Sequence, residues 1–312
     1  MDAALVLEGA DLAAAPRAAV GGKAANLAAM ATAGLPVPPF FSVTQGALAV
    51  HLLANGIRWP DHAGSVAAVR ERIRTDPVPE GVARDVIGAY RRQVAGTGQK
   101  AVAVRSSAAA EDGALASFAG QFSSVLNVAG DGALLDALRE CWASSLSDRS
   151  LAYRAGTPAT AGPGFAVVVQ TQVEARCAGV LFTIHPVDPD SGTAYIEANF
   201  GTGESVVGGL VTPDGLTVGR DGRGVVDSFV ATKRRMTTAA AGSGVLVDVD
   251  PAWRDRPVLS GDEVAAILAL GLQIEALLGG PQDVEWAIDD QALWVLQARP
   301  ITTLPGRPGG AE

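Results

Sequence analysis

Amphipathic helices are the clearest elements that the hydrophobic pattern predicts. Apolar residues recur every three to four positions over residues 131–153, and again over residues 264–278. The second run begins directly behind Ser260-Gly261-Asp262-Glu263, whose serine and glutamate have the spacing of a capping box. Residues 45–97 are expected to form three further helices, because prolines interrupt an otherwise helical pattern there. Helices are therefore expected in both halves of the chain.

Short apolar, β-branched runs predict strands between these helices. Strands are expected at residues 4–7, 40–44, 100–107, 124–128, 165–173, 179–183, 195–200, 225–232, 283–288 and 293–297. The last two are joined by a short polar turn and should form a hairpin. Strands and helices alternate irregularly, and the 312 residues exceed the roughly 100–200 of an average domain. We therefore expect an α+β protein with two lobes.

The net charge of the chain argues against two classes of binding partner. The chain carries a net charge of −9, which repels nucleic-acid backbones and anionic membrane surfaces. We therefore expect neither nucleic acid nor a membrane as a partner. Two cysteines are too few for a disulfide framework, and the N-terminus lacks the pattern of a signal peptide. No apolar run approaches the roughly 20 residues that span a bilayer, so a reduced, cytoplasmic setting is expected.

Two polar segments of the N-terminal half are candidates for contacts with an anion. Gly21-Gly22-Lys23 begins a predicted helix, where backbone amides and the lysine can reach a phosphate. The spacing is not that of a Walker A loop, and most such triplets are ordinary turns. Arg105 ends an apolar strand, which is costly unless its guanidinium meets an anion. The alternative is an arginine that pairs with Glu111 or Asp112.

A third segment contains a valine run that leads into Gln170-Thr171-Gln172. Such a strand could act as a hinge between lobes, with its backbone reading the edge of an adenine. On the pattern alone, a plain core strand is the simpler interpretation.

The strongest candidate site lies in the predicted C-terminal hairpin. Period-two alternation puts Asp283 and Glu285 on one face of the first strand, and Gln297 and Arg299 on one face of the second. Carboxylates on one face repel each other, and a cation between them removes that repulsion. Mg²⁺ prefers such oxygen ligands together with phosphates. The alternative is an exposed ladder of glutamate–arginine pairs.

Taken in order, five blocks of the sequence resemble a known family. The blocks are GGKAANLAAMATAGLPVPPFFSVT, AVRSSAAAEDGALASFAGQFSSVLNV, VVVQTQVEARCAGVLFTIHPV, IEANFGTGESVVGGLVTPD and GGPQDVEWAIDDQALWVLQARPIT. They are similar to the N-terminal nucleotide-binding domain shared by phosphoenolpyruvate synthase, pyruvate phosphate dikinase and rifampin phosphotransferase. Rifampin phosphotransferase is the most similar of the three, and the resemblance covers about residues 5–304.

The resemblance implies a two-lobed ATP-grasp fold with ATP and Mg²⁺ held between the lobes. It implies lobes at residues 1–168 and 169–304, followed by a tail at 305–312 whose Gly- and Pro-rich composition predicts disorder. The implied phosphate-binding residues are Lys23 and Arg105, with Gly120 and Ser124 in the loop over the phosphates. The implied adenine hinge contains Gln170 and Gln172, and the implied metal- and phosphate-binding set is Asp283, Glu285, Gln297 and Arg299. Glu285 and Gln297 match the metal ligands, Lys23, Arg105, Asp283 and Arg299 match the catalytic positions, and Glu197 and Glu204 match acidic positions near the nucleotide.

The reaction implied by the resemblance is a kinase reaction of the dikinase type. In the family, a phosphoryl group of ATP passes to a histidine on a separate swivelling domain and then to a final small-molecule acceptor, with AMP as a product. This chain lacks the histidine domain, so we expect that carrier in another domain or subunit. Two alternatives stay open: a kinase that acts directly on a small molecule, and an ATP-binding regulatory module without transfer chemistry.

The histidines of this chain do not match the family's carrier histidine. His51 and His62 are expected at the surface. His185 follows a predicted strand, and a structural role is favoured for it over a contact with phosphate.

Overall fold

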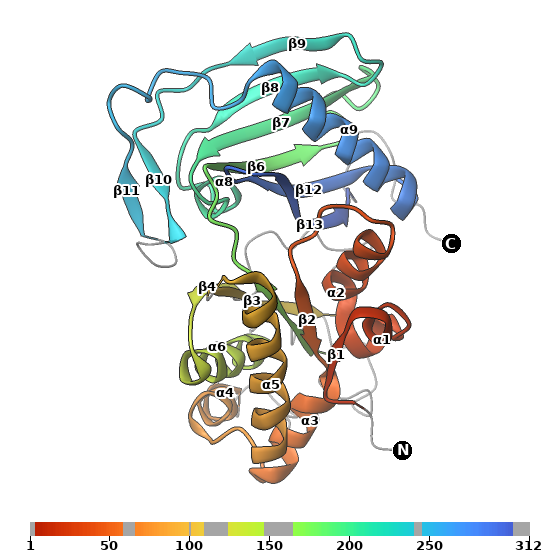
Figure 1. Cartoon of the computed structure of the whole chain (residues 1–312), viewed down its shortest axis with the longest axis vertical. Coiled ribbons are helices and arrows are strands. Elements are labelled where there is room, and N and C mark those ends of the chain that lie inside the picture. The colour runs from red at the N-terminus through yellow and green to blue at the C-terminus, as the bar shows by residue number, and fades with distance from the viewer. Residues whose placement is uncertain are drawn as a thin grey trace. The chain divides into compact units, whose positions relative to one another are not determined.

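The chain folds into two compact units, each built around its own sheet (Figure 1). The computed structural model describes residues 4–58, 66–99, 101–108, 124–146, 165–239 and 245–301. The first unit contains the described residues within Met1–Ala28, Pro39–Glu111 and Gln121–Gln172, and the second those within Ala29–Pro38, Asp112–Gly120 and Val173–Glu312. The mixed α+β class predicted from the sequence is confirmed.

The first unit has a five-stranded antiparallel sheet in the order β1-β2-β5-β3-β4. Its strands are β1 (Val6–Glu8), β2 (Phe40–Val43), β3 (Val102–Ala108), β4 (Ser124–Val128) and β5 (Phe165–Thr171). β5 is rich in valine and every one of its residues is buried, as its central place in the sheet requires.

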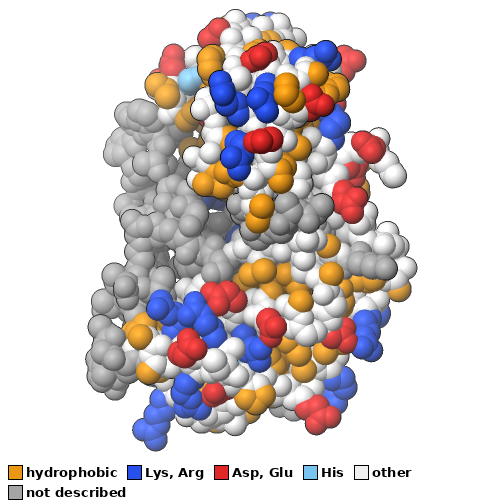
Figure 2. Space-filling model, turned by 90° about the vertical axis from the view of Figure 1, so that its left-hand side faces the viewer, with side chains coloured by type: hydrophobic (Ala, Val, Ile, Leu, Met, Phe, Trp, Pro, Cys, Tyr) orange, Lys and Arg blue, Asp and Glu red, His pale blue; other side chains and the backbone are white. Residues whose placement is uncertain are grey.

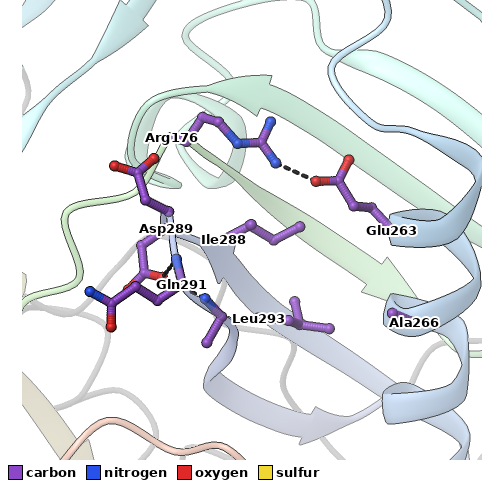
Figure 3. Close-up of a pocket in the computed structure, with 9 residues that line it drawn as sticks. Arg176, Glu263, Ala266, Ile288, Asp289, Gln291 and Leu293 are labelled. Atoms are coloured by element: carbon purple, nitrogen blue, oxygen red, sulfur yellow. Dashed lines mark hydrogen bonds and ion pairs between the residues drawn. The ribbon is translucent and has the colours of Figure 1, made fainter.

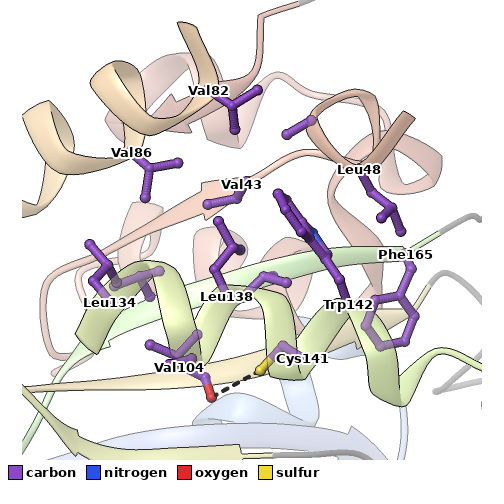
Figure 4. Packing of buried hydrophobic residues seen from close by; sticks show 14 of the residues in the cluster. Val43, Leu48, Val82, Val86, Val104, Leu134, Leu138, Cys141, Trp142 and Phe165 are labelled. Atoms are coloured by element: carbon purple, nitrogen blue, oxygen red, sulfur yellow. Dashed lines mark hydrogen bonds between the residues drawn. The ribbon is translucent and has the colours of Figure 1, made fainter. Parts of the chain in front are cut away.

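The helices of this part of the chain are α1 (Gly9–Ala13), α2 (Arg17–Thr32), α3 (Gln45–Ala54), α4 (Val66–Thr75), α5 (Glu80–Thr97) and α6 (Asp131–Ser144). Helices α3 to α6 pack their apolar sides on one face of the sheet and form the core shown in Figure 4. Trp142 of α6 is fully buried in this core, together with Val104 and Phe165 of the sheet. The alternation along β3 and β5 sends alternate residues into this core and leaves the others on the opposite face.

His51 is buried in this core, which corrects the expectation that it lies at the surface. Its side chain is fully buried, and its ring lies 5.0 Å from the Trp142 ring, centroid to centroid. The Asn55 side-chain amide lies 3.2 Å from its Nδ1. Burial lowers the pKa of His51. The expectation failed because α3 presents His51 on the same side as its apolar residues, whereas His62 lies outside the described residues.

The second unit has a six-stranded antiparallel sheet in the order β13-β12-β6-β7-β8-β9. Its strands are β6 (Cys177–Phe182), β7 (Thr193–Phe200), β8 (Asp214–Gly219), β9 (Gly224–Phe229), β12 (Gln282–Ile288) and β13 (Leu293–Pro300). The second unit also contains a separate antiparallel pair of strands, β10 (Arg235–Thr237) and β11 (Leu246–Asp248), and the short helix α8 (Glu204–Val207).

Helix α9 (Gly261–Leu278) covers one face of the six-stranded sheet (Figure 1). It begins at the predicted capping box, in which Ser260 and Glu263 exchange hydrogen bonds. Gly271 brings the helix close to β6, since a Cβ atom there would lie 2.1 Å from the Leu181 side chain. The side chains that share the orientation of Leu181 are therefore packed under α9, and those of alternate residues point to the other face.

A buried ion pair joins β8 to the segment that precedes β10. Lys233 Nζ lies 2.6 Å from Asp214 Oδ1, and both side chains are almost completely buried. Asp214 also accepts hydrogen bonds from the backbone N–H groups of Ala231 and Val258. The desolvated charges are thus paired and hydrogen-bonded, as a buried pair requires.

Charged side chains of both signs are mixed over the face seen in Figure 2. The arginines of α4 and α5 pair with acidic neighbours, as in Arg74–Glu140 and Arg92–Glu8. Exposed pairs of this kind contribute about 0–1 kcal/mol each. Within the described ranges, the chain has no helix both long and apolar enough to cross a membrane.

We expect Gly179→Ala to destabilise the protein by about 1–3 kcal/mol or more, because an added methyl overpacks the sheet. A Cβ atom at Gly179 would lie 1.8 Å from the Glu197 carbonyl oxygen and 2.8 Å from the Trp286 ring. Gly96→Ala in α5 is the matched control, since a Cβ atom there meets nothing within 4 Å. That exposed helix position should gain up to about 1 kcal/mol. Urea unfolding followed by circular dichroism measures both, and equal midpoints would contradict the prediction.

Candidate functional site

Helix α2 is kinked at Gly21, where it packs closely against strand β3. Gly21 has φ 80° and ψ 169°, which interrupts the helix, and a Cβ atom there would lie 2.1 Å from the Ser107 carbonyl oxygen. Positive φ and this close approach both require glycine. The Ser107 hydroxyl donates to the Val20 carbonyl at 2.8 Å and accepts the Ala24 N–H at 3.2 Å. The regular part of the helix therefore begins directly after Gly21.

Lys23 lies against strand β3 beside Arg105. Its side chain is buried, and its Nζ donates to the Ser106 carbonyl oxygen at 2.7 Å. Ser106 directly follows Arg105 in the strand, so the structure brings these two predicted phosphate-binding residues to one part of the first unit.

The register of the first sheet places two more predicted residues in relation to Arg105. Arg105 lies opposite Ser124 of β4, and Gln170 of β5 lies opposite Ala103. Opposed residues and residues two apart in a strand share a face, so Arg105, Ser124 and Gln170 lie on the face opposite the helical core. Gly120 lies outside the described residues.

The two predicted hinge glutamines differ in their contacts. Gln170 is buried, and no residue that the structure describes hydrogen-bonds its Nε2. Gln172 is the last residue of the first unit, and its Oε1 accepts the Asn127 N–H at 3.4 Å. Buried amide nitrogens normally have a partner, so Gln170 is suited to a ligand acceptor atom.

In the second unit, the predicted C-terminal hairpin forms with the register that alternation indicates. Asp283 lies opposite Arg299, and Glu285 lies opposite Gln297. Arg299 donates from Nε at 2.8 Å and from Nη2 at 2.6 Å to the same oxygen of Asp283. The structure thus brings all four side chains to one face of neighbouring strands, away from α9.

Glu197 joins this face through strands β6 and β7. Glu285 lies opposite Val180 of β6, and Val180 lies opposite Glu197 of β7. Three acidic side chains therefore share one face, although Glu197 is far from the hairpin in sequence. Glu204 begins α8 and is not on a strand, so the register does not add it to this set.

The carboxyl groups of Asp283 and Glu197 on this face have raised pKa values. Burial raises the pKa of Asp283, Arg299 lowers it in part, and the charge of Glu285 raises it further. Burial also raises the pKa of Glu197, with a second contribution from Asp283. Like charges in a partly desolvated place are the common cause.

No group of three or more His, Cys, Asp and Glu side chains arranged to hold a metal ion occurs in the part of the chain that the structure describes. Mg²⁺ commonly takes one or two protein ligands and fills its other positions with water and phosphate oxygens. Glu285 and Gln297 provide oxygen donors of that kind, and their role as metal ligands stays a prediction.

His185 makes the contacts of a structural residue. Its Nδ1 accepts the backbone N–H groups of Val187 at 3.3 Å and Asp188 at 3.2 Å, which closes the turn after β6. Its ring also contacts the Tyr195 ring, with centroids 5.4 Å apart. These contacts agree with the structural role that the sequence favoured for His185 over a contact with phosphate.

A hollow of about 390 Å³ lies at the other end of the hairpin, by the turn between β12 and β13 (Figure 3). Arg176 and Glu263 form an ion pair at its edge, and Asp289 and Leu293 also line it. None of the predicted site residues lines this hollow.

The face of the second sheet that contains Asp283, Glu285 and Glu197 is called the carboxylate face below. Tyr195 is a further polar residue on this face, and the sequence pattern did not single it out. It is two positions before Glu197 in β7, so the same alternation that places Glu197 could have found it.

Comparisons with known proteins identify the family. The family model described as pyruvate phosphate dikinase, AMP/ATP-binding domain, matches residues 17–310. A rifampicin phosphotransferase from Streptomyces is 40% identical to this chain, over 97% of the chain and 36% of the relative. A probable phosphoenolpyruvate synthase from Methanothermobacter thermautotrophicus is 38% identical, over 91% of the chain and 44% of the relative. The chain thus spans less than half the length of these curated relatives.

A solved D-alanine-D-alanine ligase from Coxiella burnetii aligns with 88% of this chain and 46% of its own, at 10% identity and a TM-score of 0.37. The resemblance expected from the five sequence blocks is confirmed by the family model and by the relatives. Because the family model covers nearly the whole chain, this protein belongs to the pyruvate phosphate dikinase AMP/ATP-binding domain family.

Proposed function

We propose that this chain binds Mg-ATP and donates a phosphoryl group from it to a histidine on a separate domain or subunit, while the remaining phosphoryl group passes to water or phosphate and AMP is released. The ATP-grasp arrangement and the roles given above to individual residues belong to this proposal. The final acceptor is a small molecule that this chain does not select.

The family and the names of the relatives support this proposal. The matching family model describes an AMP/ATP-binding domain. The two relatives are named as a rifampicin phosphotransferase and a probable phosphoenolpyruvate synthase, and both are more than twice as long as the part that this chain matches. A chain that corresponds to the nucleotide-binding part of such enzymes would donate the phosphoryl group, and other domains would receive it.

The observation that carries the proposal is the acidic face of the second sheet. Asp283, Glu285 and Glu197 share that face, and the pKa of Asp283 and of Glu197 is raised. Keeping like charges together in a partly buried place is unfavourable unless a cation is bound among them. A Mg²⁺ ion held by Glu285 and Gln297 would supply that charge and would neutralise phosphate oxygens.

The cationic side chains then have roles that follow from the charge of ATP. Phosphoryl transfer depends mainly on positioning and on neutralising the charge that develops on the phosphate oxygens. Arg299 is held in place by its ion pair with Asp283, and its side chain is only partly exposed. Lys23 and Arg105 offer two further cations in the first unit, and Gln170 offers to the base an amide nitrogen that no described residue hydrogen-bonds.

We expect Arg299→Lys to weaken the binding of Mg-ATP about 10-fold or more, because lysine cannot reproduce the fork of a bound guanidinium. Arg176→Lys is the matched control, since Arg176 is also ion-paired in this unit but lies by the hollow on the α9 side. Isothermal titration calorimetry with Mg²⁺ and AMP-PNP measures both affinities. Equal affinities for the two variants would contradict the role given to Arg299.

We expect Glu197→Gln to stabilise the ligand-free protein at pH 7. A carboxyl whose pKa is raised on folding contributes stability that is fully present below its ordinary value of 4.5 and is lost as the pH rises through the raised value. The amide has no such loss, so the difference in melting temperature should grow above pH 4.5 and close below it. Glu174→Gln, at an exposed position, is the control. A variant less stable than the parent at pH 7 would refute the electrostatic argument.

The product of ATP distinguishes the proposal from its alternatives. We expect the chain to form AMP from Mg-ATP only when a histidine-carrier domain of the family is added in trans. Arg105→Met should then lower the rate about 10²–10³-fold, as the loss of one charge-stabilising group typically does. Chromatography of the nucleotides is the measurement. ADP formed with a small acceptor alone would indicate a direct kinase, and no product with binding intact would indicate a regulatory module.

A further inference from the structure

Tyr195 lies on the carboxylate face and has no role in the function proposed so far. It lies opposite Phe182 of β6, which in turn lies opposite Asp283 of β12. Opposed residues in antiparallel strands share a face, so Tyr195 points to the same side as Asp283 and Glu197. Its phenol is therefore part of the surface on which Mg-ATP is proposed to bind.

The direction of the phenol is set by its neighbours. A Cβ atom on Gly215 of β8 would lie 2.4 Å from the Tyr195 hydroxyl oxygen, so the hydroxyl extends over this glycine. His185 packs against the Tyr195 ring at an interplanar angle of 66°. The two contacts hold the half-buried ring, and the absence of a side chain at Gly215 leaves the space that the hydroxyl uses.

No residue that the structure describes accepts a hydrogen bond from the Tyr195 hydroxyl. Burial raises the pKa of Tyr195, and the negative charge of Glu197 raises it further, so the phenol keeps its proton. Tyrosine hydroxyls in partly buried places usually have a hydrogen-bond partner. A ligand that carries acceptor oxygens would supply one.

We propose that the Tyr195 hydroxyl donates a hydrogen bond to Mg-ATP bound on this face. The inference rests on the proposed function, because Mg-ATP is the ligand expected there and its phosphate and ribose oxygens are acceptors. A neutral donor suits this place, since it contacts an anionic ligand without pairing permanently with the carboxylates as a lysine would. Tyr195 is thus a nucleotide-binding residue in addition to the set matched by the family.

Tyr195→Phe removes only the hydroxyl oxygen and tests the contact directly. We expect the affinity for Mg-AMP-PNP to fall about 10-fold, the loss typical of one hydrogen bond to a charged group. Gly215→Ala keeps the hydroxyl but displaces it, because the added Cβ atom takes its place, and should weaken binding in the same direction. Tyr90→Phe is the control: its hydroxyl accepts the Gly130 N–H at 2.9 Å inside the first unit, so stability should fall without a change in affinity.

The outcomes separate this inference from the proposed function. If the parent protein does not bind Mg-AMP-PNP, the proposed function itself fails. If the parent binds, Arg299→Lys weakens binding and Tyr195→Phe does not, only the inference on Tyr195 is overturned. A loss in Gly215→Ala alone would also overturn it, because the effect would then come from the backbone of β8.

Discussion

The pairing of strands β12 and β13 is the constraint on which the candidate site depends. Side chains alternate between the two faces of a strand, so a shift of one residue would turn Asp283 and Glu285 under α9. The observed register is held from both sides, because β12 also pairs with β6 from Asp283 to Ile288. The ion pair of Arg299 with Asp283 also requires this register, because a shift by one residue would place the two side chains on opposite faces. The chemistry of the face is therefore a consequence of strand pairing.

That face is electrostatically unfavourable when no ligand is bound. Burial and the neighbouring carboxylates raise the pKa of Asp283 and of Glu197, and Arg299 offsets only part of this for Asp283. A protein gains nothing in stability from such an arrangement, and strain of this kind is typical of binding sites. A cation and a phosphate group would relieve it together, the first by pairing with carboxylates and the second by pairing with the guanidinium. The same closely spaced charges thus destabilise the ligand-free fold and favour the binding of a cation and a phosphate group.

The sequence predicted those parts of the structure that depend on local pattern. The hairpin and the helix behind Ser260 follow from alternation and capping within a few residues, and both are confirmed. Contacts between distant segments could not be predicted from pattern, since periodicity assigns a face but not the neighbouring strand. Lys23 meets the carbonyl of Ser106 across 83 positions, and Glu197 reaches the hairpin only through β6. His51 is a different case, because it lies on the same side of α3 as Leu48 and Leu52, so local periodicity could have indicated its burial.

In both sheets, helices cover one face and leave the other uncovered. This explains which face of each unit can hold a functional site. In the first sheet, helices cover the face that contains Val104, and Arg105 points to the other. In the second, α9 covers the face that contains Leu181, and Glu285 and Tyr195 point away. A helix packed on a strand requires apolar side chains at alternate positions, so the remaining positions are free to be polar. Polar residues collect on the uncovered faces because packing does not need those positions, and it is on these faces that a bound ligand could contact charged side chains.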